Sequence, residues 1–223
     1  MLKPVRGAAM GVSKDHTVKV SVACFGKLQT GERAKLCLRV GKEMNRKYSD
    51  FLYVLWVKTG REEIAFKQIQ TLFGDSITWL NLLVETFFRK QGKVLKITKP
   101  AFPGYIFLTT EIENNEFIFR ARECARQSLS ILKPLCYTGT FQAAMREEER
   151  AAIDCLWQGK DCIETSTGIL VGDHVVVTTG PFIGRECVIV SISPRKRQAI
   201  IEIEFMGGVR QATIGLEIVE KIP

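Results

Sequence analysis

The sequence has few of the residues from which catalytic and metal sites are usually built. It contains only two histidines, His16 and His174, and none of its seven cysteines belongs to a Cys-x-x-Cys pair. A phosphate-binding glycine loop, a paired carboxylate motif and a nucleophile with a histidine in a plausible setting are also missing. We therefore expect no cofactor, no metal site and no enzymatic activity, with the cysteines kept reduced in a cytosol.

Long apolar runs are missing as well. No stretch approaches the roughly 20 consecutive apolar residues that a membrane-spanning helix requires. The basic residues near the start of the chain are not followed by the apolar segment of a secretory signal. These absences predict a cytoplasmic protein that has no membrane partner.

The positive net charge of +8 is confined to one end of the chain. Residues 1–47 hold eleven Lys or Arg against three acids, residues 48–169 hold fifteen of each, and residues 170–223 hold six of each. The overall charge is therefore no argument for function in the rest of the chain. We interpret residues 1–47 as a basic extension that is disordered or non-native, with a nucleic-acid-binding arm as the alternative.

The C-terminal part has the pattern of a small all-β barrel. Short β-branched runs lie at residues 175–177, 187–192, 199–205 and 210–214, separated by glycine and proline. In the third run the period of two places one set of side chains on a buried face, namely Ile201, Ile203 and Phe205. This pattern predicts an SH3-like β-barrel over residues 171–223.

The part before it has the pattern of an α/β sandwich with helices covering a mixed sheet. One apolar helix face is formed by Ala65, Ile69, Leu72 and Phe73. Strands are expected over 52–57, 79–88, 94–97, 105–108 and 129–132. Further helices are expected after a cap at Asn114 or Asn115 and from about Ala143 to Trp157. In the first turns of the second helix, Glu147–Glu149 are expected to be solvated. We predict this domain over residues 48–158 and a linker over 159–170.

Two sets of motifs resemble those of a known family. Gly172–Asp173, Val175–Val177, Gly180–Phe182 and Gly184 resemble the KOW motif of ribosomal proteins and of NusG transcription factors. Leu52–Glu63 and Phe102–Phe107 are similar to the opening strand and the Phe-Pro-Gly-Tyr strand of the NusG N-terminal domain. Within that family, Lys58–Glu63 and Ile203–Gly208 look most like LoaP, an antiterminator subfamily.

The resemblance implies sites for protein partners. NusG-type domains place aromatic side chains of these two strands on a patch that grips RNA polymerase, which corresponds here to Trp56, Tyr105 and Phe107. The alternative is that all three belong to the core, because aromatic residues in strands are mostly buried. Phe205 corresponds to a barrel residue that docks ribosomal protein S10 or Rho, and it too is alternatively a core residue.

Local basic clusters are candidates for contact with RNA, although a solvated basic face is the ordinary alternative. One cluster, at a predicted hairpin turn, is Arg195, Lys196 and Arg197. A second hairpin carries Lys93 and Lys96 among other cations, and a helix face carries Arg122 and Arg126 four residues apart.

The leading hypothesis is a monomeric transcription antitermination or elongation factor that acts by binding alone. It would hold RNA polymerase through its N-terminal domain, and nascent RNA, such as a leader hairpin, or a protein partner through its KOW domain. The alternatives are a general housekeeping NusG factor and a ribosome-associated KOW protein that binds RNA.

Overall fold

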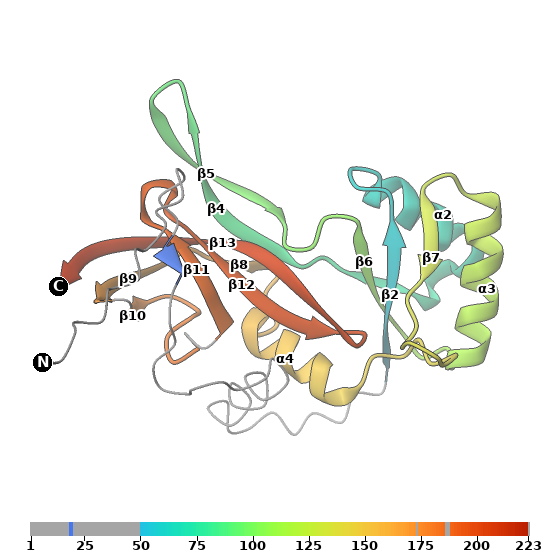
Figure 1. The fold of residues 1–223 in the computed structure, drawn as a ribbon. Helices are drawn as coiled ribbons and strands as arrows, with labels where there is room; N and C mark the ends of the chain where they lie inside the picture. The colour runs from blue at the N-terminus through green and yellow to red at the C-terminus, as the bar shows by residue number, and fades with distance from the viewer. Residues whose placement is uncertain (1–17, 20–49, 173, 186–187, 223) are drawn as a thin grey trace, which may run out of the picture.

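The computed structural model describes residues 18–19, 50–172, 174–185 and 188–222. An α/β region at one end of the molecule continues into an all-β region at the other (Figure 1). We call residues 50–163 the N-terminal region and residues 166–222 the C-terminal β region. This arrangement confirms the predicted fold class. No helix of the described residues is long and apolar enough to cross a membrane.

A four-stranded antiparallel sheet forms the centre of the N-terminal region. Its strands, in the order β3-β6-β2-β7, are β3 (Thr78–Leu80), β6 (Tyr105–Thr110), β2 (Phe51–Val57) and β7 (Ile131–Pro134). Helices α2 (Glu62–Phe73) and α3 (Asn114–Gln127) lie together beside this sheet (Figure 1). They pack on the face that carries Tyr53, Leu55 and Val57. The Tyr53 ring stacks on Phe117 of α3 at 3.8 Å between ring centroids.

The helices bury most of the side chains that their spacing predicts. Ala65, Ile69 and Phe73 are buried in α2, whereas Leu72 is exposed, so its predicted burial was wrong. It lies past the edge of the stripe that faces the sheet. In α3 the buried residues are Phe117, Ile118, Ala121 and Cys124, with Ala125 half-buried beside them.

The predicted asparagine cap of α3 was wrong. The residue at the N-cap is Glu113, and it makes no capping hydrogen bond through its side chain. The amide oxygen of Asn114 instead accepts hydrogen bonds from the backbone N–H groups of Ala143, at 2.7 Å, and Ala144, at 3.2 Å. Asn114 therefore secures the segment before helix α4 (Glu147–Trp157), which begins four residues later than predicted.

A long hairpin projects from the region where the two halves of the molecule meet (Figure 1). It consists of β4 (Leu83–Lys90) and β5 (Lys93–Pro100), and the short strand β8 (Cys162–Ile163) pairs in parallel with β4. Its two-residue turn, Gln91–Gly92, has positive φ at both positions, as a tight type I′ hairpin requires. The single strand predicted over residues 79–88 is therefore two strands, β3 and β4.

The C-terminal β region contains five strands among its described residues. They are β9 (Ser166–Val171), β10 (His174–Thr179), β11 (Ile189–Ser193), β12 (Gln198–Phe205) and β13 (Gly208–Ile222). The sheet order is β1-β11-β12-β13-β9-β10, and β9 pairs in parallel with β13. The segment predicted as a linker, 159–170, contains β8 and most of β9. These strands were not predicted from the sequence because their apolar alternation is too short to be recognised.

The basic extension lies almost wholly outside the described residues. Its described part is β1 (Val18–Lys19), which pairs antiparallel with Ile192 and Ser191 of β11.

One apolar core joins the two regions. It contains Leu52 and Val54 of the sheet, Ile153 and Trp157 of α4, and the inward residues of β12. The alternation predicted for β12 is confirmed, with Ile201, Ile203 and Phe205 buried and Glu202 and Glu204 half-buried. The β region is thus docked against the sheet face opposite helices α2 and α3.

Candidate functional site

The three aromatic residues predicted to bind polymerase share one face of the N-terminal sheet. Trp56 of β2 pairs with Tyr105 of β6, and Val54 pairs with Phe107, so that Trp56, Tyr105 and Phe107 all point away from α2 and α3. Tyr53, on the other face of β2, points to the helices. We call Trp56, Tyr105 and Phe107 the aromatic face.

The aromatic face is only partly open to solvent. The Trp56 side chain is 42% exposed and has the Lys133 ammonium 5.6 Å from its ring centroid. Tyr105 is half-buried, and Phe107 is only 2% exposed. The prediction of one shared face therefore agrees with the geometry, but the C-terminal β region covers its Phe107 end.

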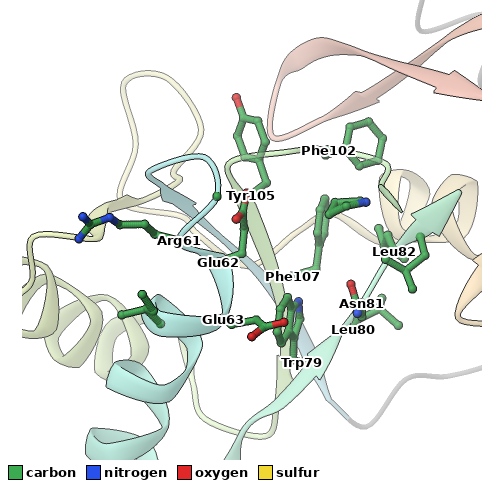
Figure 2. Close-up of a pocket in the computed structure, with 14 residues that line it drawn as sticks. Arg61, Glu62, Glu63, Trp79, Leu80, Asn81, Leu82, Phe102, Tyr105 and Phe107 are labelled. Atoms are coloured by element: carbon green, nitrogen blue, oxygen red, sulfur yellow. The ribbon is translucent and has the colours of Figure 1, made fainter. Parts of the chain in front are cut away.

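A cleft of about 390 Å³ lies beside Tyr105 and Phe107 (Figure 2). Its walls also include the start of α2 at Arg61–Glu63, Trp79–Leu83 and Phe102. The Glu62 carboxylate accepts a hydrogen bond of 2.8 Å from the backbone N–H of Gly104, in the Phe-Pro-Gly-Tyr segment. This bond joins the loop before β6 to the start of the helix, and the cleft beside it has both polar and apolar walls.

Phe205, predicted as a partner contact or a core residue, closes the other side of the aromatic face. It is fully buried and packs edge-on against Phe102, Tyr105 and Phe107, at 5.1, 5.8 and 5.3 Å between ring centroids. The Arg210 guanidinium lies over the Tyr105 and Phe205 rings, and its Nε donates to the Tyr105 hydroxyl at 3.2 Å. In this structure the contact of Phe205 is thus within the chain.

Glu149 of α4 holds the turn between β12 and β13. Its carboxylate accepts hydrogen bonds from the backbone N–H groups of Met206, at 3.0 Å, and Gly207, at 3.3 Å. It also accepts one from the Tyr137 hydroxyl at 2.5 Å. Burial and the neighbouring Glu149 carboxylate raise the pKa of Tyr137. The prediction that Glu149 is solvated was therefore wrong. Nothing in the sequence distinguishes it from its neighbours Glu147 and Glu148.

The basic residues predicted to bind RNA fall into two separate places. The β4–β5 hairpin, with Lys93 and Lys96, lies beside the β11–β12 turn, where the 3₁₀ segment Pro194–Lys196 leads into Arg197. Arg122 and Arg126 lie on α3, at the opposite end of the molecule (Figure 1). There Arg122 contacts the Phe141 ring and Arg126 pairs with Glu123 at 3.1 Å.

The cations of the first place are not equivalent. Arg195 and Lys196 are exposed, whereas Arg197 pairs with Glu217 at 3.2 Å and lies 5.7 Å from the Phe87 ring centroid. Lys93 is exposed, and Lys96 pairs with Glu85 at 3.1 Å. The structure thus leaves Arg195, Lys196 and Lys93 available to a ligand. The Lys96–Glu85 pair joins the two strands of the hairpin, and Arg197 contacts both Glu217 of the β region and Phe87 of the hairpin.

The fold and these surfaces define a two-part protein, in which an α/β region with an aromatic sheet face carries an all-β region. The KOW motif family matches residues 171–204, so the C-terminal β region contains a KOW motif. The chain is also similar to a solved structure described as domain interaction in NusG of Thermotoga maritima, with 17% identity and a TM-score of 0.42. That match covers 76% of this chain and 94% of the other. A comparison with curated proteins found no match.

Proposed function

We propose that this chain is a NusG-type transcription factor that acts by binding alone, without catalysis. Its aromatic face would bind RNA polymerase, and its KOW-containing β region would bind nascent RNA or a protein partner. The observation that carries the proposal is the aromatic face itself. Large apolar side chains on a sheet opposite its helices need a cover, and here that cover is another part of the same chain.

The contacts of this cover suit a reversible interface. Three aromatic pairs centred on Phe205 contribute about 0.5–1.5 kcal/mol each beyond the area they bury. Around them lie polar contacts of Arg210 and Glu149, of the kind that rims protein interfaces. A polymerase surface of matching shape would therefore compete with the β region for Phe107 and Tyr105.

The finer assignment within the family is to the antiterminator type similar to LoaP. It is supported by the basic turn at Arg195–Lys196, which stays exposed while the β region is docked. A housekeeping NusG factor needs no such turn. A ribosome-associated KOW protein needs no aromatic face.

Copurification tests the proposed function against these alternatives. A tagged full-length chain should recover core RNA polymerase from cells of its own organism. Recovery should fall for Trp56→Ala and remain for Phe119→Ala, whose side chain is 73% exposed on α3. Recovery of ribosomal subunits in place of polymerase would contradict the proposal.

A further inference from the structure

The groove between the β4–β5 hairpin and the β11–β12 turn has the geometry of a ligand site built from both regions. It has a volume of about 310 Å³, and its lining residues are Phe87, Phe88, Arg89 and Val94 on one side and Arg195–Gln198 on the other. The side-chain amide of Gln198 donates to the backbone carbonyl of Phe87 at 2.7 Å. The two walls are therefore fixed to each other only while the β region is docked.

The charge of the groove is positive. Arg89, Lys90 and Lys93 of the hairpin and Arg195 and Lys196 of the turn make no ion pair with any described residue. Two carboxylates contact the basic residues around its walls, but each is already paired: Glu217 with Arg197 and Glu85 with Lys96. Of the five unpaired cations, Arg89, Arg195 and Lys196 line the groove, and Lys90 and Lys93 lie opposite each other at the end of the hairpin. No described carboxylate lines the groove, so a polyanion there would meet cations without a competing described acid.

An exposed aromatic residue is among those that line the same groove. Phe88 is 50% exposed, and its cross-strand neighbour Leu95 is 46% exposed. A ring beside cations suits a nucleotide whose base is unpaired, since a free base can stack while its phosphate contacts Lys or Arg. In a duplex the bases stack on one another, so their faces are not available to stack on the Phe88 ring.

We propose that this groove binds single-stranded RNA, with a base on Phe88 and phosphates on the hairpin and turn cations. The proposal rests on the RNA-binding part of the proposed function and specifies where and in what form the RNA binds. Because the site exists only in the docked arrangement, RNA binding and docking stabilise each other, by the reciprocity of linked equilibria.

The experiment is a titration of a labelled short oligouridine with the full-length chain at several salt concentrations. Two double variants remove one wall each: Arg89→Ala with Lys93→Ala, and Arg195→Ala with Lys196→Ala. The matched control is Arg122→Ala with Arg126→Ala, which removes the same charge from α3. Each wall variant should weaken binding and reduce the slope of log K against log salt by about 1.4, while the control leaves both unchanged.

The aromatic contact is tested separately. Phe88→Ala should weaken binding roughly five- to hundredfold, the range for losing one stacked base, whereas Phe119→Ala should leave it unchanged. Phe88→Trp should retain binding, and RNA should quench its fluorescence. Unchanged affinity for Phe88→Ala, or an equal affinity of the chain for duplex RNA, would overturn the proposed single-stranded site.

The outcomes separate this proposal from the function on which it rests. Loss of binding in the turn variant alone would place RNA on the β region and overturn the composite groove, leaving RNA binding intact. Unchanged binding in both wall variants would overturn the groove entirely. Polymerase binding, measured independently with the same proteins, decides the proposed function in either case.

Discussion

The Phe205 ring meets the Phe107 ring at a centroid distance of 5.3 Å and an interplanar angle of 67°. Phe205 is the last residue of strand β12 in the KOW-containing region, and Phe107 lies on β6 in the central sheet of the N-terminal region. This edge-on contact occupies a side chain that the proposed function assigns to polymerase. Docking and polymerase binding at Phe107 are therefore mutually exclusive in this account.

Glu149 provides a way to loosen the docking without touching the aromatic face. Glu149→Ala leaves the backbone N–H groups of Met206 and Gly207 without their carboxylate acceptor, a loss of about 1.5–3 kcal/mol per charged hydrogen bond before solvent compensates. Hydrogen exchange of these two amides should become faster.

The control is Glu148→Ala, which removes an exposed carboxylate from the same turn of α4. Equal exchange at Met206 and Gly207 in the two variants would show that Glu149 does not hold the β12–β13 turn.

Two glycines of the KOW segment should differ in what they tolerate. Gly180 has φ of +99°, and a Cβ there would lie 2.4 Å from the Ser166 hydroxyl oxygen and 2.8 Å from its Cα. Gly180→Ala should cost about 3 kcal/mol or more of stability, because left-handed strain and overpacking add.

Gly172 is the matched comparison, since it also has positive φ but a Cβ there meets nothing within 4 Å. Gly172→Ala should cost only about 1–2 kcal/mol, from strain alone. Urea unfolding of both variants checks the difference, and equal losses would show that the close approach to Ser166 is unimportant.

The pH dependence of stability should include a contribution from Glu85. Burial acts to raise the pKa of Glu85, but hydrogen bonds from Thr165 and Lys96 outweigh it, so the pKa lies below its ordinary value. A lowered pKa in the folded state stabilises the fold above the ordinary carboxyl pKa, and this stabilisation is lost as the pH falls.

Glu85→Gln should therefore lower stability by about 1 kcal/mol at neutral pH, and by less below about pH 4. Urea unfolding of the two proteins at a series of pH values measures the difference, with the exposed Glu111→Gln as control. A difference that does not shrink in acid would contradict the assignment of charge-dependent contacts to Glu85.

The local pattern of the sequence predicts the elements well and their contacts poorly. Period-two alternation places Ile201, Ile203 and Phe205 on one face because that rule depends only on the strand. It does not reveal what covers the face, because the cover comes from residues about a hundred positions earlier, such as Phe107. The same limit applies to Glu149, whose partners are backbone groups of a distant turn.

For the basic residues, too, the sequence predicts the local clusters but not their contacts. Clustering along the chain identifies the hairpin and the β11–β12 turn as separate candidates, and only the docked arrangement brings them to one groove. The structure also distinguishes Arg195 from Arg197, two residues further along the same turn. Arg195 is exposed, whereas Arg197 pairs with Glu217.

The central claim is tested most directly by titrating core RNA polymerase with wild type, Trp56→Ala and Glu149→Ala. Trp56 is the cleanest probe because it is exposed and its cation contact, Lys133, belongs to the N-terminal region and not to the β region. The account predicts that Trp56→Ala loses about 2 kcal/mol or more of affinity, as an aromatic anchor does, and that Glu149→Ala binds more tightly because docking competes less. Equal affinity for all three proteins, or no polymerase binding at all, would contradict it.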